Sequence, residues 1–233
     1  IADIPSRGTG LGSSSAVTVG LLNALYAYAG RETSAEQLAR EACEIEIDIL
    51  EQPIGRQDQY ASAYGGINSI RFDTEGVSVD SITLLENWIG RISDEFTLVF
   101  TGMSRSASDV LSEAPEDESD KMARLRAIRG QADQAYDLLA SGDISALGSL
   151  IGEAWNAKRG ISASVSGGEL DALHDRIMSM GANGAKLLGA GGGGFFLVHG
   201  SPNLREELAN LGAPHRLIPL DIDWTGSEII HNG

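Results

Sequence analysis

Apolar side chains at helical spacing follow the glycine-rich start of the chain. The stripe consists of Val17, Leu21, Leu25 and Tyr28, and Leu22 widens it. This spacing predicts a helix that packs one face against a sheet. Residues 2–5 are typical of the end of a strand, so the expected order is strand, glycine loop and helix.

A second helix is predicted over residues 34–51, where Ser34 and Gln37 have the spacing of a capping box. The expected buried stripe consists of Leu38, Ala42, Ile45 and Ile49. At about 100° per residue, one flank gathers the acids Glu41, Glu44, Asp48 and Glu51. Glu46 lies apart from them beside apolar positions. It is therefore either an acid at the edge of an amphipathic helix or one with a specific partner, such as a metal ion or a basic group.

The second half of the chain predicts a layered α/β arrangement. The expected strands are 96–100, 185–188, 195–199 and 217–220, and the expected helices are 121–141, 144–159, 169–180 and one from Pro202. Asp143 is the expected cap of the second of these helices, and Trp155 is expected in the core. A length of 233 residues allows one large or two modest domains, and we prefer two, placed at 1–92 and 93–233 with a boundary near Trp88–Ser93.

The net charge of −16 argues against nucleic acids and acidic membranes as partners. The sequence contains no bilayer-length apolar run and no signal-peptide pattern, so a cytoplasmic location is the simplest prediction. A homodimer is left open. Cys43, the only cysteine, is expected to be a small packing residue. The histidines lack metal-ligand spacing and are expected to be structural or surface residues: His174, His199, His215 and His231.

The segment from Gly8 to Ala16 combines alternating glycines with three serines at the start of a helix. Glycines allow the backbone to approach a ligand closely, and a helix N-terminus attracts anions. The serine hydroxyls can cap the helix, bond a phosphate oxygen or ligate magnesium. The segment lacks the lysine of the Walker pattern, so it indicates another kind of phosphate loop, or a structural turn between strand and helix.

Asp58 begins a short helical stretch with polar neighbours on both sides. It could simply be an N-cap aspartate. Phosphoryl transfer needs a magnesium ligand and a group that orients or deprotonates the attacking hydroxyl. Because Glu46 and Asp58 follow a phosphate loop, this acid pair can supply both.

These residues carry a resemblance to the GHMP family of small-molecule kinases, which includes galactokinase, homoserine kinase and mevalonate kinase. Residues 5–16 resemble the second signature of that family, and residues 186–195 resemble its third. Glu46 stands twelve residues before Asp58, where galactokinases place their metal-binding glutamate, and residues 55–59 match their Gly-x-x-Asp-Gln segment. The resemblance implies a two-domain α+β fold, with an N-terminal α/β domain and a C-terminal ferredoxin-like α/β sandwich.

Within the family, the sequence of the motifs is most similar to that of the kinases of D-glycero-D-manno-heptose 7-phosphate. The matching stretches are residues 4–16, 51–60, 65–68, 100–105 and 155–159. The resemblance implies transfer of the γ-phosphate of ATP to the anomeric hydroxyl of this sugar phosphate. The residues that it assigns to the nucleotide are Gly8, Thr9, Gly10, Leu11, Gly12, Ser13, Ser14, Ser15, Gly189, Gly191 and Gly192. Ser14 and Glu46 are assigned to Mg²⁺, and Asp58 to the catalytic role.

Two cations are candidate contacts for the substrate. Arg105 follows the strand 96–100, where a guanidinium can clamp a phosphate through two hydrogen bonds. It can equally be a surface arginine that balances an acidic protein. Lys158 continues an apolar helix face and can reach a site from a buried stem, or extend its ammonium to water.

Members of the family begin with a strand and a first signature that helps to hold the sugar, and this sequence starts only at the strand before the second signature. We expect the chain to be a fragment of a longer kinase. The alternatives are a kinase for another sugar, such as galactose, fucose or an amino sugar, and a catalytically silent nucleotide-binding protein.

Overall fold

The structure is a computed structural model that describes residues 9–84, 86–104, 110, 118–160 and 165–230. The chain forms two compact units. The helical unit consists of residues 12–83 and 222–233, and the sheet unit consists of residues 1–11 and 84–221. Both units are therefore assembled from separate stretches of the sequence.

The predicted boundary at Trp88–Ser93 needs correction, because these residues lie inside helix α4, Glu86–Glu95. The chain changes unit between Thr83 and Leu84, and it also does so at Leu11–Gly12 and Asp221–Ile222. No single boundary residue divides the units, because the chain passes from one unit to the other at three places.

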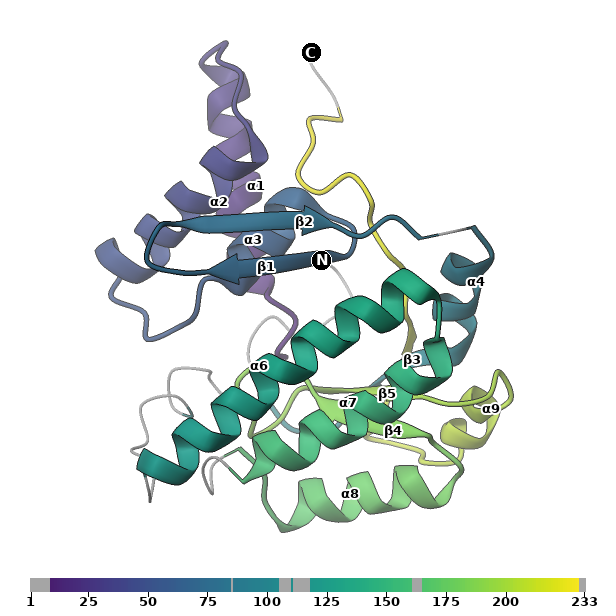
Figure 1. Cartoon of the computed structure of the whole chain (residues 1–233). Coiled ribbons are helices and arrows are strands. Elements are labelled where there is room, and N and C mark those ends of the chain that lie inside the picture. The colour runs from purple at the N-terminus through teal and green to yellow at the C-terminus, as the bar shows by residue number, and fades with distance from the viewer. Residues whose placement is uncertain (1–8, 85, 105–109, 111–117, 161–164, 231–233) are drawn as a thin grey trace. The chain divides into compact units, whose positions relative to one another are not determined.

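The helical unit packs three helices around a small core and adds a β-hairpin (Figure 1). Its elements are α1 Ser13–Tyr28, α2 Ala35–Cys43, the π-helix η1 Glu44–Ile49, α3 Gln57–Tyr64, β1 Asn68–Phe72 and β2 Val77–Ser81. The core consists of Val19, Leu38, Ala39, Ala42, Cys43, Tyr60 and Ala63. Cys43 is thus a buried packing residue, as predicted, and burial raises the pKa of its thiol to about 11. The antiparallel β1–β2 hairpin was not predicted.

Helix α1 uses a different apolar face from the one predicted. Its predicted stripe is exposed: Val17 52%, Leu21 58%, Leu25 55% and Tyr28 93%. The helix packs on its neighbours through Val19, Leu22 and Tyr26 instead. Apolar residues surround most of this helix, so periodicity alone could not choose between overlapping stripes.

The predicted helix 34–51 begins as expected and then changes type. The backbone N–H of Gln37 donates to the Ser34 Oγ at 3.2 Å, which caps α2. From Glu44 the chain forms η1, in which the N–H of Leu50 donates to the carbonyl of Ile45 at 2.9 Å. The longer π-helical repeat changes the angular position of each later side chain. Ile49 is consequently 66% exposed and does not belong to the buried stripe.

The sheet unit contains a four-stranded antiparallel sheet in the order β4-β5-β3-β6. The strands are β3 Phe96–Phe100, β4 Gly184–Leu187, β5 Phe195–His199 and β6 Leu217–Pro219, and the helices besides α4 are α6 Glu118–Ser141, α7 Ile144–Arg159, α8 Gly168–Ser179 and α9 Leu204–Ala209. Helix α7 packs against β4, and α6 packs along α7 (Figure 1). The strand order confirms the predicted ferredoxin-like sandwich.

The core of the sheet unit lies between the sheet and its helices. Trp155 is fully buried there, as predicted, with its ring edge-on to Phe196 at 5.7 Å between centroids. The N–H of Ala146 donates to the predicted cap Asp143 at 3.0 Å. His199 is buried in the same unit, where its Nε2 lies 3.2 Å from a carboxylate oxygen of Glu95.

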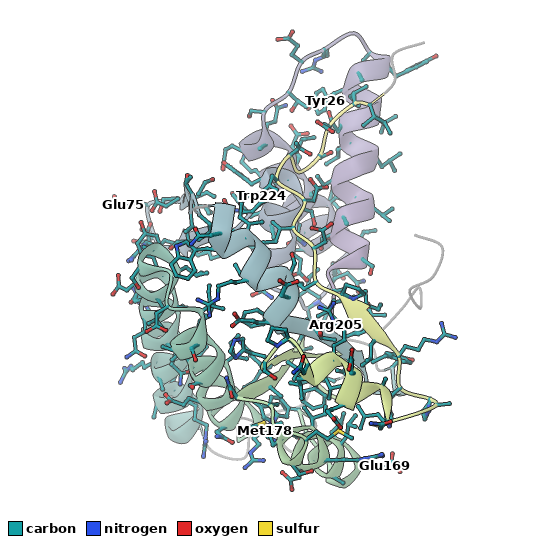
Figure 2. The ribbon with its side chains drawn as sticks, turned by 90° about the vertical axis from the view of Figure 1, so that its right-hand side faces the viewer. Tyr26, Glu75, Glu169, Met178, Arg205 and Trp224 are labelled. Carbon is teal, nitrogen blue, oxygen red and sulfur yellow. The ribbon has the colours of Figure 1, made fainter. Side chains whose placement is uncertain are left out.

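The end of the chain returns to the helical unit (Figure 2). The side-chain amide of Asn23 on α1 donates to the Ser227 carbonyl at 3.0 Å, and the ring of Trp224 lies against Gly66. Helix α1 is therefore held in place partly by a segment about 200 residues later in the sequence. Among the described residues, no helix is long and apolar enough to cross a membrane.

Candidate functional site

The N-terminus of α1 presents backbone N–H groups without a side-chain cap. Gly12 is its N-cap, in the left-handed conformation at φ 64°, and no side chain bonds the first turn. The first intrahelical bond runs from the Ala16 N–H to the Gly12 carbonyl at 3.0 Å. The amides of Ser13, Ser14 and Ser15 therefore precede the helical hydrogen-bond pattern, and such groups attract an anion.

Asp58 lies directly against Gly12. A Cβ placed on Gly12 would come within 3.2 Å of both Cβ and Cγ of Asp58. The N-cap of α3 is Arg56, so Asp58 is a first-turn residue and the N-cap interpretation is wrong. The carboxylate is thus held beside the uncapped start of α1.

The environment of Asp58 favours the protonated form more than water does. Burial raises the pKa of its carboxyl, and the nearby charge of Glu46 raises it further. A hydrogen bond with the Gln57 side chain works in the opposite direction. A carboxylate with a raised pKa is a stronger proton acceptor once it is ionised.

Glu46 is 4% exposed, which rules out an acid that extends to water from the edge of its helix. Its Oε2 accepts hydrogen bonds from the Ser15 Oγ at 2.8 Å and from the Gln59 Nε2 at 2.5 Å. Ser14, the serine assigned to magnesium, is exposed, and Ser15 is the serine that contacts Glu46. The sequence pattern could not distinguish these neighbours.

The donor set fits Mg²⁺. Buried carboxylates in proteins are usually paired with a cation or bound to a metal, and in the described part of the chain no ion pair to Glu46 is found. The same residues contain no group of three or more histidine, cysteine or carboxylate ligands. Magnesium typically binds one or two carboxylates together with substrate phosphates, so a single glutamate and a serine near an anion-binding helix end are suitable.

In the sheet unit, residues 9–11 of the first glycine loop pack against a second glycine loop, residues 189–194 between β4 and β5. A Cβ on Gly10 would lie 2.8 Å from the Leu188 carbonyl oxygen, and one on Gly189 would overlap the Gly10 Cα. A Cβ on Gly194 would overlap the Thr9 carbonyl. Glycine is required at these positions because two backbones are in contact.

The rest of the second loop contacts other backbone segments. The Gly192 N–H donates to the Val165 carbonyl at 3.0 Å, and the Gly194 N–H donates to the Met103 carbonyl at 2.9 Å. A Cβ on Gly191 would lie 2.8 Å from the Val165 Cα. The glycine run is therefore explained in large part by close backbone packing.

Lys158 reaches the start of the second glycine loop. Its Nζ donates to the Gly189 carbonyl and lies 3.5 Å from the Leu187 carbonyl. Burial, together with the charge of Lys186, lowers the pKa of Lys158 to about 8. Its contacts are with the backbone of this loop, so a role in substrate binding stays a prediction.

Two family models match the chain. The model described as GHMP kinases N terminal domain matches residues 1–66, and the one described as GHMP kinases C terminal matches residues 135–212. The chain belongs to the GHMP kinase family. The resemblance inferred from the sequence motifs is thereby confirmed, and both models fall in the expected order along the chain.

Individual relatives of this GHMP kinase chain are named as kinases of different small molecules. The D-glycero-alpha-D-manno-heptose 7-phosphate kinase of Campylobacter jejuni is 30% identical over 210 residues, which are 89% of this chain and 62% of that protein. The mevalonate kinase of Methanothermobacter thermautotrophicus is 30% identical over 202 residues, 84% of this chain and 62% of that protein. The chain thus spans somewhat less than two thirds of the length of these curated relatives.

Among solved structures, a D-glycero-D-manno-heptose 1-phosphate kinase from Bacteroides thetaiotaomicron superimposes with a TM-score of 0.73. The match covers 97% of this chain and 65% of that one at 24% sequence identity. At this identity the comparison establishes the shared GHMP kinase fold alone.

Lys158 gives a testable pH dependence of stability. Its pKa of about 8 in the folded chain lies below its usual value of 10.5, so between these pH values the unfolded chain binds a proton that the folded chain lacks. This group therefore makes wild-type stability rise with pH across that window. Relative to Lys158→Met, the wild type should gain about 1–3 kcal/mol in the free energy of unfolding from pH 7.5 to 10.5, measured by urea titration.

The companion variant is Lys186→Met. Removal of the neighbouring charge should raise the pKa of Lys158 and shift the window to higher pH. A difference between wild type and Lys158→Met that stays constant over the window would contradict the buried position of this amine.

Gly8 and Arg105 lie outside the described residues, so their predicted roles stay predictions. The sequence interpretation missed Gln59 as the partner of Glu46. Gln59 shares the buried side of α3 with Tyr60 and Ala63. A glutamine on an apolar helix face was the signal that could have revealed it.

Proposed function

We propose that this chain carries the phosphoryl-transfer site of an ATP-dependent kinase that acts on the hydroxyl group of a small molecule. The observation that carries the proposal is the position of Asp58 against Gly12, at the helix end that lacks a side-chain cap. An acid next to an anion-binding helix terminus is the arrangement that phosphoryl transfer to an alcohol requires.

The residues of the first loop would hold the nucleotide phosphates. The N–H groups of Ser13 to Ser15 would donate to phosphate oxygens, and the positive end of α1 would stabilise their charge. Thr9, Gly10 and Leu11 continue the same loop, and the proposal extends to them and to the glycines Gly189, Gly191 and Gly192 of the second loop.

Glu46 would hold Mg²⁺ together with a serine hydroxyl. The Ser14 side chain is exposed, whereas the Ser15 hydroxyl already contacts Glu46. Either serine can therefore contribute a ligand. The bound ion would neutralise charge on the transferred phosphoryl group. Glu46 is buried and held by two donors, so its carboxylate is positioned in advance.

Asp58 would accept or orient the proton of the attacking hydroxyl. Its raised pKa suits this role, because a less acidic carboxylic acid corresponds to a more basic carboxylate. Positioning and charge neutralisation supply most of the rate enhancement in such transfers, so Asp58 contributes through placement as well as basicity.

The acceptor proposed first is the anomeric hydroxyl of D-glycero-D-manno-heptose 7-phosphate. Two observations support it. The chain is 30% identical to the Campylobacter jejuni kinase named for this substrate, and five stretches of its sequence resemble kinases of this sugar phosphate. A mevalonate kinase is equally identical over a similar share of the chain, which favours an alcohol other than a sugar as the second candidate.

ATP-dependent ADP release in the presence of Mg²⁺ tests both candidates. The acceptors compared are heptose 7-phosphate, galactose, fucose, N-acetylglucosamine and mevalonate. Turnover with heptose 7-phosphate alone would support the first candidate, and turnover with mevalonate alone would support the second. Binding of MgADP without turnover on any acceptor would favour a catalytically silent nucleotide-binding protein over a kinase.

A further inference from the structure

Gln59 is fully buried in the helical unit, with 0% of its surface exposed. Glutamine is rarely buried completely, because each polar atom of its amide needs a hydrogen-bond partner away from water. Gln59 stands in the first turn of α3, directly after Asp58. Its position therefore calls for an explanation beyond the packing of an apolar face.

The two ends of the Gln59 amide have different surroundings. Nε2 donates to the Glu46 Oε2 at 2.5 Å, and among the described residues Oε1 has no hydrogen-bond partner. The opposite orientation of the amide would place its oxygen against a carboxylate, so the assignment follows from charge. A buried unpaired carbonyl is destabilising, and an apolar side chain of the same shape would avoid this cost.

The Ser15 hydroxyl donates to the same oxygen of Glu46, at 2.8 Å. Two donors that converge on Oε2 fix the orientation of the carboxylate. No hydrogen bond to Oε1 of Glu46 is found in the described part of the chain, so this oxygen keeps its lone pairs for a ligand.

Gln59 also joins two functional elements. Consecutive side chains on a helix diverge by about 100°, so Asp58 faces Gly12 while Gln59 faces Glu46. Glu46 belongs to η1, and π-helical turns are rare and frequent at functional sites. The short helix α3 thus fixes both Asp58 and the carboxylate of the π-helix through adjacent residues.

We propose that Gln59 is a positioning residue that directs the free oxygen of Glu46 toward the metal ion. The proposal rests on the proposed function, because it assumes that Glu46 binds a divalent cation. The amide of Gln59 acts through Glu46 and contacts neither metal nor substrate. Residues that orient metal ligands in this way typically change metal affinity by about 10–100-fold when they are replaced.

The test measures Mn²⁺ affinity in the presence of ADP by electron paramagnetic resonance of free Mn²⁺. Gln59→Met keeps the length of the side chain and removes the donor. We expect it to weaken Mn²⁺ binding by about tenfold or more. Glu46→Gln identifies the metal site, and Gln131→Met is the matched control, since Gln131 also has a buried amide oxygen without a partner and lies on α6 in the other unit. Far-UV circular dichroism and the urea midpoint verify that each variant is folded.

The outcomes separate the two proposals. If Glu46→Gln leaves Mn²⁺ affinity unchanged, the proposed metal site is absent and the role of Gln59 is overturned with it. If Glu46→Gln weakens binding and Gln59→Met stays within about twofold of wild type, the metal site holds and the positioning role is overturned. An equal loss in Gln131→Met would assign the effect to general destabilisation and also overturn it.

Discussion

Asp58→Asn should lower kcat for phosphoryl transfer by about 10²–10⁴-fold, the range typical of a lost general base. The substitution keeps the shape of the side chain that lies against Gly12, so MgATP affinity should change little. In the wild type, kcat/KM should fall as the pH drops through the pKa of Asp58, which burial raises above its usual value. This acid limb should be absent from the residual activity of the variant.

The matched control for Asp58→Asn is Asp80→Asn, an exposed position on β2 of the same unit. Its kinetics and pH profile should equal those of the wild type. Unchanged kcat in Asp58→Asn would remove this residue from the mechanism and leave only the anion-binding part of the proposal.

Gly12→Ala should reduce both stability and kcat. Alanine at φ 64° is strained by about 1–2 kcal/mol, and its Cβ would lie 3.2 Å from Asp58, which must shift by a few tenths of an ångström. A displaced carboxylate loses its alignment with the hydroxyl, so we expect kcat to fall by about 10–10²-fold. Urea unfolding and steady-state kinetics measure the two effects.

Gly20→Ala provides the comparison on the same helix. Gly20 lies in the interior of α1, and a Cβ there would meet no atom within 4 Å. This variant should be more stable than wild type by about 0.5–1 kcal/mol, with unchanged kinetics. If both glycine variants behave alike, the contact between Gly12 and Asp58 has no special role.

Local sequence signals located several elements of both units. The helices capped by Ser34 and Asp143 are marked by short-range hydrogen bonds and helical periodicity, and the strand Phe96–Phe100 is marked by a short continuous apolar run. The β1–β2 hairpin and helix α4 were missed, although both are as short and regular as elements that were found. Neither strand of the hairpin has a fully buried residue, so the contrast between a buried and an exposed face is weak.

The sequence predicted the candidate site as a set of residue types, and the structure adds the contacts that its described residues make. The sequence distinguished Glu46 from the solvated acids, and its burial agrees with that distinction. It could not select Ser15 over Ser14 as the partner of Glu46, because adjacent serines carry the same local signal. It also named Lys158 as a candidate contact for substrate, which stays a prediction; the described contacts of this lysine are backbone carbonyls of the second loop.

The sequence by itself determined the family and the helix caps Ser34 and Asp143, and it singled out the glycine loops and the two acids as candidates, because each depends on residue type at short spacing. Only the tertiary structure decided which face of α1 is buried, where α2 becomes a π-helix and that Gln59 holds Glu46. These features arise from contacts between residues far apart in the chain. Their free energies depend on which surfaces meet, and periodicity within one segment contains no information about its partner.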